Sequence, residues 1–282
     1  MPQSKDYQTY FSEELALIER ALEQSLPQPT PPAIKLHEAM RYAMIPGGKR
    51  IRPLLVLCVV KTLGAAWEQA MPAAVALELL HGYTLIHDDL PCMDDDVLRR
   101  GQPTVHIAFG EATALLAGDA LLTLAFEQAV QSAHDPVRIV SSLAQAAGAN
   151  GVIAGQVADL QAVEQDVVSA EQLDFIHSNK TAALFCAAAV MGVYAAGKGN
   201  ESELVQTFTT FGFALGMAFQ YIDDLLDAGT ETAFSSVKVL GEAEVRARAD
   251  QYTNKALQTL EAYGPEADSL RQLTQFMLQR ET

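Results

Sequence analysis

The fold is decided by residues 77–96, which read LELLHGYTLIHDDLPCMDDD and join an apolar helical run to five aspartates. Apolar side chains recur with helical spacing as far as Ile86, and Pro91 ends the helix just after Asp88 and Asp89. Carboxylates at a helix C-terminus oppose the helix dipole, and carboxylates this close together repel one another. A flexible acidic loop is the competing interpretation. We favour a metal site at the helix end, because cations between the carboxylates would offset both costs.

A second acidic cluster, Asp223-Asp224-Leu225-Leu226-Asp227, ends another apolar helical run. Asp223 and Asp227 are four residues apart, so they stack on one helix face, whereas Asp224 projects about 100° away. Oxygen-only ligand sets favour Mg²⁺, which usually completes its shell with water and substrate phosphate. A solvated acidic face would explain either cluster alone. The two clusters together predict a diphosphate held through magnesium between two acidic helix ends.

Basic residues occur in small groups at matching places along the chain. Residues 47–53, GGKRIRP, open a helix after a glycine turn, and a positive helix end with Lys and Arg is a natural phosphate site. Arg99 and Arg100 follow the first acidic cluster, and Lys180-Thr181 begins an alanine-rich helix. Salt bridges to the acidic clusters would also explain these pairs. With the acidic clusters, they predict two anionic ligands, one bound through metal and one bound directly by Lys and Arg.

Composition narrows the possible partners and the compartment. The chain has 282 residues, of which 49% are hydrophobic, enough to bury a large core. A formal net charge of −16 argues against nucleic acid and anionic membrane as partners. The three cysteines lie far apart and form no CxxC pair, and the N-terminal residues contain no apolar signal segment. We therefore expect a cytoplasmic protein.

Helical periodicity is nearly continuous, and no convincing alternating strand pattern occurs. No linker or repeat divides the chain, so we expect a single all-α domain over residues 1–282. Small residues in its apolar segments suit a helical bundle around a central active-site cavity, and ordinary tight core packing explains them equally well. The uncharged stretch 181–197 is just short of membrane-spanning length and is interpreted as a buried helix. The expected helices cover residues 7–24, 33–43, 50–63, 68–90, 104–117, 119–133, 137–163, 170–196, 202–229, 241–262 and 266–280.

An ordered set of motifs resembles the short-chain trans-polyprenyl diphosphate synthases of bacteria, most of all the farnesyl diphosphate synthases (geranyltranstransferases). The resemblance runs from about Phe11 to the C-terminus and is far more specific than any single motif. It implies an isoprenoid-synthase-type helical bundle and a homodimer. The motifs that carry it are GGKRIRP (47–53), LELLHGYTLIHDDLPCMDDD (77–96), LRRGQPTVH (98–106), GQVAD (155–159), KT (180–181) and FQYIDDLLD (219–227).

The resemblance assigns a role to each matching position. Three Mg²⁺ ions on the allylic diphosphate would have protein ligands at Asp88, Asp94 and Asp223, with Asp89, Asp224 and Asp227 in the same motifs. The groups implied as catalytic are Asp88, Asp89, Asp94, Lys180 and Asp223. Isopentenyl diphosphate would be bound by Lys49, Arg52, His81 and Arg100. The allylic substrate would be contacted by Arg99, Lys180, Thr181 and Gln220, while Gln156 and Asp159 match a motif lining the second acidic site.

The implied reaction condenses isopentenyl diphosphate with dimethylallyl or geranyl diphosphate to give farnesyl diphosphate. Magnesium-assisted loss of the allylic diphosphate leaves a carbocation, which the isopentenyl double bond attacks before a proton is lost. The protein's contribution is orientation, electrostatic stabilisation and exclusion of water. No nucleophilic side chain is required, and we find no such triad in the sequence.

Product length is predicted from the helix before Asp88. Thr84 lies one turn before Asp88 and Tyr83 is its bulky neighbour. One turn rises about 5.4 Å, close to one isoprene unit, so a tyrosine here leaves room for few units. We therefore expect a C15 product made through a C10 intermediate. A C20 product remains an alternative. The preferred allylic starter remains open between the C5 and the C10 diphosphate.

The sequence departs from the family pattern after Asp227. The family has a loop of the form GKxxGxDxxxxKxTY there, and this chain is about 14 residues short, without the lysines that help to close such a site. Either the chain is truly shorter, or a segment is missing from the sequence as given. We favour the second, because such lids are often disordered without ligand. An intact mass above that of the 282 residues would establish it.

Three rival functions remain at this point. A terpene cyclase would typically replace the second cluster by an Asn/Ser/Glu motif and would not need Lys49, Arg52 and His81. A non-catalytic partner subunit of a heteromeric prenyl synthase tends to lose one acidic cluster, and both are present here. An HD-type phosphohydrolase is suggested only by His87-Asp88. Absence of isopentenyl diphosphate turnover would favour the cyclase, and activity of the purified chain alone would exclude the partner subunit. The other family-matched segments argue against the phosphohydrolase.

Overall fold

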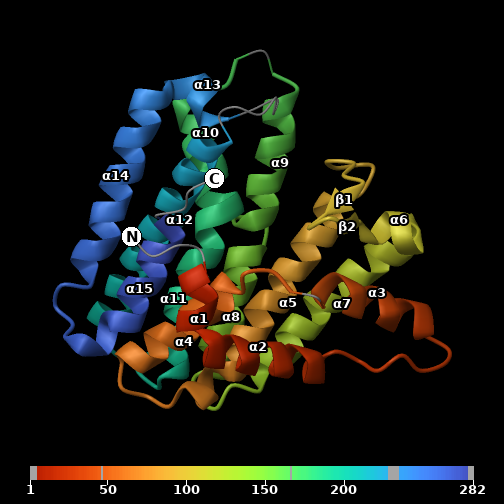
Figure 1. Cartoon of the computed structure of the whole chain (residues 1–282), viewed down its shortest axis with the longest axis horizontal. Coiled ribbons are helices and arrows are strands. Elements are labelled where there is room, and N and C mark those ends of the chain that lie inside the picture. The colour runs from red at the N-terminus through yellow and green to blue at the C-terminus, as the bar shows by residue number, and fades with distance from the viewer. Residues whose placement is uncertain (1–4, 46, 166, 228–234, 279–282) are drawn as a thin grey trace.

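The computed structural model describes residues 5–45, 47–165, 167–227 and 235–278, and helices make up most of these ranges (Figure 1). This confirms the all-α prediction. Within these ranges, a short antiparallel hairpin of β1 (Leu98–Arg99) and β2 (Gln102–Pro103) is the only sheet. The α-helices are α1 (Lys5–Tyr10), α2 (Ser12–Ser25), α3 (Ile34–Met44), α4 (Ile51–Thr62), α5 (Met71–Asp88), α6 (Val105–Phe109), α7 (Glu111–Val130), α8 (Pro136–Ala147), α9 (Val152–Val163), α10 (Ala170–Ile176), α11 (Ala183–Ala195), α12 (Ser202–Leu226), α13 (Ser236–Leu240), α14 (Glu242–Thr259) and α15 (Asp268–Leu278).

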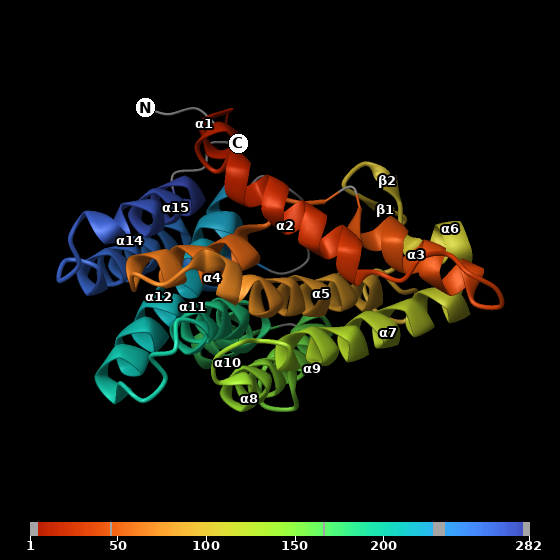
Figure 2. The ribbon, with the colours of Figure 1, turned by 90° about the horizontal axis from the view of Figure 1, so that it is seen from below.

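Helix α5 lies at the centre of the molecule and carries the first acidic cluster. Pro72 occupies its first turn, where a missing N–H costs nothing, and Pro91 follows its end at Asp88. Figure 2 shows α5 between α2 and α7, both of which it contacts. Leu77 and Leu80 are fully buried, and burying each such side chain contributes about 1.5–3 kcal/mol. This packing holds the aspartates at the end of a rigid element.

Helix α11 confirms that the uncharged stretch at 181–197 is a buried helix. Ten of its thirteen residues are buried, and it packs against α4, α8 and α12. The small side chains of this segment permit such close packing on several sides.

Several helix boundaries differ from the sequence-based expectation, including the predicted single helix 7–24, which is divided into α1 and α2. The predicted break near residue 118 is wrong, because α7 continues through Gly118 and the chain instead breaks at Gly110, whose φ is +86°. The predicted single helix 137–163 is two helices, α8 and α9, separated at residues 148–151. Glycines mark both of the later breaks, but periodicity alone did not distinguish them from glycines inside helices.

A π-helical turn, His177–Ala182, lies between α10 and α11 and carries Lys180 and Thr181. The sequence predicted one continuous helix here and did not reveal the wider turn. Glycines let neighbouring helices approach its backbone: a Cβ at Gly155 of α9 would collide with Lys180, and one at Gly216 of α12 would crowd Ala182. Such π turns are frequent at functional sites.

The chain after the second acidic cluster is only partly described. Helix α12 ends at Leu226 and α13 begins at Ser236. The predicted shortening after Asp227 concerns residues 228–234, which lie outside the described residues.

Candidate active site

The first acidic cluster folds back on the end of α5. The main-chain N–H of Asp94 donates to the carbonyl of Asp88 at 2.9 Å, so the loop returns the second carboxylate to the helix end. The Asp88 carboxylate accepts a hydrogen bond from Gln156 and lies 3.9 Å from the Lys180 ammonium. Lys180 also contacts Asp159 at 2.5 Å. Elements far apart in sequence, α5, α9 and the π turn, thus meet around one group of charges.

This group carries more negative charge than its one lysine can balance. Burial raises the pKa of Asp88 to about 6, although Lys180 opposes the shift. Burial also raises the pKa of Asp94. For Lys180, burial disfavours the ammonium, but Asp159 and Asp88 outweigh it and raise its pKa. Clustered carboxylates that resist ionisation in this way favour an added cation.

The donor chemistry of this cluster fits magnesium. Asp88 and Asp94 offer hard oxygen ligands, and Mg²⁺ is usually held by one or two carboxylates together with water and phosphate. Within the described ranges, no three Asp, Glu, His or Cys side chains form a closed metal cage. Asp88 and Asp94 would therefore hold the ion on one side and leave the other side to a substrate.

The raised pKa of Asp88 predicts a pH-dependent metal affinity. A carboxyl group whose pKa is near 6 is protonated below that pH, and a proton there competes with a metal ion. We expect Mg²⁺ binding to weaken about tenfold per pH unit below 6 and to be nearly constant above pH 7. Calorimetric Mg²⁺ titrations between pH 5 and 8 would measure this. An Asp88→Asn variant should lose the dependence, and a flat profile in the unaltered chain would contradict the prediction.

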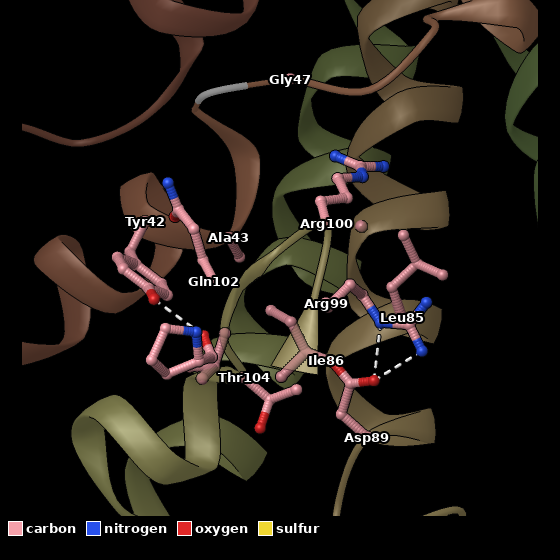
Figure 3. Close-up of a pocket in the computed structure, with 13 residues that line it drawn as sticks. Tyr42, Ala43, Gly47, Leu85, Ile86, Asp89, Arg99, Arg100, Gln102 and Thr104 are labelled. Atoms are coloured by element: carbon pink, nitrogen blue, oxygen red, sulfur yellow. Dashed lines mark hydrogen bonds and ion pairs between the residues drawn. The ribbon is translucent and has the colours of Figure 1, made fainter. Parts of the chain in front are cut away.

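Asp89 lines a pocket of about 160 Å³ (Figure 3), whose lining does not include Asp88 or Asp94. Its carboxylate is 2% exposed and accepts from Nε of Arg99 at 2.6 Å. Arg99 also lies 3.4 Å from Asp96. The structure therefore places Asp89 as the partner of Arg99, beside Asp88 in sequence but not in the same cluster. The predicted contact between Arg99 and an allylic substrate remains a prediction.

All four residues predicted to bind isopentenyl diphosphate line one pocket of about 520 Å³: Lys49, Arg52, His81 and Arg100. Nη1 of Arg52 lies 3.2 Å from Nε2 of His81. Burial and the neighbouring arginine hold the pKa of His81 well below its usual range, so the ring is neutral. Among the described residues Arg100 makes no hydrogen bond, and burial together with nearby Arg50 lowers its pKa. Such a pocket suits an anion.

Arg50 lies in the same motif but has an internal role. It is 3% exposed, and its guanidinium contacts Glu19 of α2 and Glu78 of α5, each at 2.8 Å. It also donates to the carbonyl of Met44. These contacts fix the loop that carries Lys49 and the start of α4, which carries Arg52. Spacing alone could not show this.

The second acidic cluster divides in a similar way. Asp224 accepts from Nε2 of Gln220 at 2.9 Å and from the main-chain N–H of Ser236 at 3.0 Å, and it also accepts from the Ser236 hydroxyl. Burial alone would raise its pKa, but these bonds and His177 outweigh burial and lower it. Asp223 and Asp227 lie one turn apart at the end of α12. Asp223 therefore remains the predicted metal ligand of this cluster.

Thr181 and Gln220, both predicted to contact the allylic substrate, are hydrogen-bonded to each other. The Thr181 hydroxyl donates to Oε1 of Gln220 at 2.7 Å. This bond joins the π turn to α12 and to Asp224. Among the residues of this network, Gln156 was matched only through the family resemblance, and His177 was not among the predicted site residues. A signal existed in both cases: Gln156 lies three residues before Asp159, and His177 lies three residues before Lys180.

A comparison with known families decides the assignment of the whole chain, since the polyprenyl synthetase model matches residues 34–246. The chain belongs to the polyprenyl synthetase family. Its curated relatives include a heterodimeric geranylgeranyl pyrophosphate synthase large subunit of Arabidopsis thaliana, 45% identical over 80% of this chain. Geranylgeranyl pyrophosphate synthase 7 of the same plant is 41% identical over 94% of the chain. The matches span 62% and 76% of these two relatives, so the chain covers less than two thirds of the first.

Solved structures place this chain among proteins of the same fold. An FPP/GFPP synthase from Zymomonas mobilis superposes with a TM-score of 0.90 at 37% identity, covering 98% of this chain and 100% of the other. A geranyltransferase from Legionella pneumophila gives a TM-score of 0.89 at 33% identity, with 99% of each chain covered. The synthase fold therefore extends over nearly the whole chain.

Tyr83, the predicted chain-length residue, is buried in helix α5. Its side chain is 5% exposed, and its ring centroid lies 5.6 Å from that of His87. Its buried hydroxyl has no hydrogen-bond partner within the described ranges. Thr84 instead donates to the carbonyl of His81 at 2.8 Å, on its own helix. Tyr83 is thus the bulkier of the two candidates and the one not held by a local hydrogen bond.

Proposed function

We propose that the chain is a magnesium-dependent trans-prenyl diphosphate synthase that condenses isopentenyl diphosphate with an allylic diphosphate to form farnesyl diphosphate. One observation carries the proposal: helix α5 contributes residues both to the acidic cluster and to the basic pocket. His81 and Asp88 are seven residues apart on α5, which corresponds to about 10 Å along the helix. This spacing suits two diphosphates whose hydrocarbon parts meet between them.

The side chains have separate tasks in this reaction. Lys49, Arg52 and Arg100 bind and orient isopentenyl diphosphate, and neutral His81 adds a hydrogen bond without adding charge. Lys180 holds an oxygen of the allylic diphosphate next to Asp88. Magnesium, when bound, neutralises the leaving diphosphate. The allylic C–O bond breaks with its electrons on the diphosphate, the isopentenyl double bond forms the new C–C bond, and the diphosphate accepts the released proton.

A C20 product is the second candidate, because the named curated relatives are geranylgeranyl pyrophosphate synthases. One of them is described as the large subunit of a heterodimer. This also supports a partner subunit as an alternative to self-association. The presence of both acidic clusters in this chain favours a catalytic subunit in either case.

Product analysis tests the proposal directly. The purified chain would be incubated with Mg²⁺, labelled isopentenyl diphosphate and, separately, dimethylallyl, geranyl or farnesyl diphosphate. We expect C15 as the main product from the first two starters and little extension of the third. Extension of farnesyl diphosphate to C20 would support the second candidate, and no turnover with any starter would reject synthase activity.

Replacing Tyr83 by Ala is expected to lengthen the product. The change removes a buried ring beside the acidic helix end and opens about one isoprene unit of space along the helix. The main product should shift from C15 to C20 or longer, as measured by chromatography of the dephosphorylated alcohols. Thr84→Ala is the matched control and should leave C15 dominant. Unchanged C15 output from Tyr83→Ala would show that another residue limits the chain.

We also propose that the protein is a homodimer through α6 and α7. Ile107, Leu115 and Leu116 are about half exposed on these helices. Among the described helices α7 alone is long and apolar enough to span a membrane, with 33% of that window buried. A second copy would cover this surface in water. Leu116→Glu should therefore convert a dimer to a monomer in analytical ultracentrifugation, while an unchanged dimer would place the interface elsewhere.

The cysteines support a reducing compartment, and we propose the cytoplasm. Cys58, Cys92 and Cys186 are free thiols in the described structure. Burial raises the pKa of Cys186 to about 11, which makes a reactive thiolate unfavourable at neutral pH.

A further inference from the structure

We propose that His177 is a positioning residue for the synthase reaction, which holds the π turn bearing Lys180 and Thr181 against the second acidic cluster. This inference rests on the function proposed above. It concerns a residue outside both substrate sites, and its effect would pass through Asp224.

The π turn needs an external constraint. A π-helical turn has poorer geometry than an α-helical turn and persists mainly where its surroundings favour it. Gly155 and Gly216 permit close backbone approach on two sides, but glycines supply no bond that selects the wider turn. Residues that face the turn must therefore provide the specific contacts. If the turn relaxed to an α-helix, Lys180 would rotate away from Asp88.

His177 is the first residue of the turn and makes such a contact. It is 4% exposed, and its Nε2 lies 3.5 Å from Oδ2 of Asp224. Its ring packs edge-on against Tyr221, with centroids 5.0 Å apart. Its Nδ1 is buried and has no hydrogen-bond partner in the described part of the chain. Burying an unsatisfied ring nitrogen costs free energy, which a phenylalanine packed on Tyr221 would avoid.

Asp224 connects His177 to Gln220 and Thr181, which are predicted to contact the allylic substrate. Its Oδ1 accepts from Gln220, and Gln220 accepts from Thr181 in the π turn. Its Oδ2 is shared between His177 and Ser236, the first residue of α13. The π turn is therefore tied to α12 by His177 and Thr181, and the Ser178 hydroxyl adds a contact to Met217 of α12. Asp223 is adjacent to Asp224 in the last turn of α12, so the contacts that hold this turn also orient Asp223.

Two substitutions separate positioning from packing. His177→Phe keeps a ring against Tyr221 but cannot donate to Asp224, whereas His177→Gln keeps an N–H donor. We expect His177→Phe to lower kcat about 10- to 100-fold, to raise KM for the allylic diphosphate and to raise the Mg²⁺ concentration required. KM for isopentenyl diphosphate should change less than twofold, because that pocket is built on α4 and α5. His177→Gln should recover most of the loss, and His134→Phe, at an exposed histidine, should behave like the unaltered chain.

A binding measurement gives a second readout that does not depend on turnover. Calorimetry with Mg²⁺ and inorganic pyrophosphate should show about tenfold weaker binding to His177→Phe. If that variant does not fold, as judged by circular dichroism, Ser236→Ala tests the same carboxylate from its other side and should show a smaller effect of the same sign.

The outcomes distinguish this inference from the proposed function. Absence of product from the unaltered chain rejects the synthase, and the pyrophosphate titration then still tests positioning. If the unaltered chain is active and folded His177→Phe matches it in allylic KM, Mg²⁺ requirement and pyrophosphate affinity, the inference is wrong. It is also wrong if Gln and Phe cause equal losses, because that would indicate packing alone.

Discussion

Asp88→Asn is expected to reduce kcat by about 10³-fold or more, since it removes charge where the leaving group must be stabilised. The asparagine keeps the shape and the neighbour Gln156 but cannot act as an anionic metal ligand. It also leaves Lys180 with one fewer carboxylate partner. Single-turnover kinetics with saturating substrates would measure the loss, and the Mg²⁺ requirement should rise in parallel.

Asp95→Asn is the matched control for this change. Asp95 lies in the same acidic segment, is exposed and has a φ of +53°, which asparagine tolerates well. Its substitution should change kcat less than threefold, because nothing places it in the site. Equal losses from both variants would mean that the segment acts through its total charge, which would contradict a specific role for Asp88.

Lys180→Gln should cost about 10²- to 10³-fold in kcat. The ammonium lies between Asp159 at 2.5 Å and Asp88 at 3.9 Å, and without it these carboxylates repel one another. The variant also loses a positive contact to the departing diphosphate. Steady-state kinetics should show the loss mainly in kcat and in KM for the allylic substrate.

Lys61→Gln provides the comparison for removing a lysine. Lys61, in the last turn of α4, pairs with Glu14 at 2.8 Å. It is partly exposed, so the pair is worth at most about 1 kcal/mol. It should leave kcat unchanged. If Lys180→Gln were as active as Lys61→Gln, the assignment of Lys180 to the allylic site would be wrong.

The positions of the acidic cluster and the basic pocket were predictable because their motifs lie at helix ends. GGKRIRP begins α4, and the first acidic cluster ends α5, as the positions of proline and glycine indicated. The resemblance to a known family then placed Lys49, Arg52, His81 and Arg100 together, and the structure brings all four into one pocket. Composition and spacing alone did not bring them together, because α4, α5 and the β1–β2 hairpin meet only in the folded chain.

Neighbouring residues of the same type could not be separated in this way. Asp89 follows Asp88 and Asp224 follows Asp223, yet Asp89 contacts Arg99 and Asp224 contacts Ser236 and His177. Consecutive helical residues point about 100° apart, so one faces the site and the next faces other elements. The identity of those elements depends on packing between distant segments.

The sequence by itself determined the helical class, the two acidic helix ends and the basic helix start, because local periodicity and helix-breaking residues act over a few residues. Only the tertiary structure decided the π turn at His177–Ala182 and which carboxylates of each acidic cluster bond to other side chains rather than face the candidate metal site. Both depend on contacts with α9, α12 and the hairpin, which no local pattern encodes. Packing between distant helices therefore selects which of the predicted charges meet.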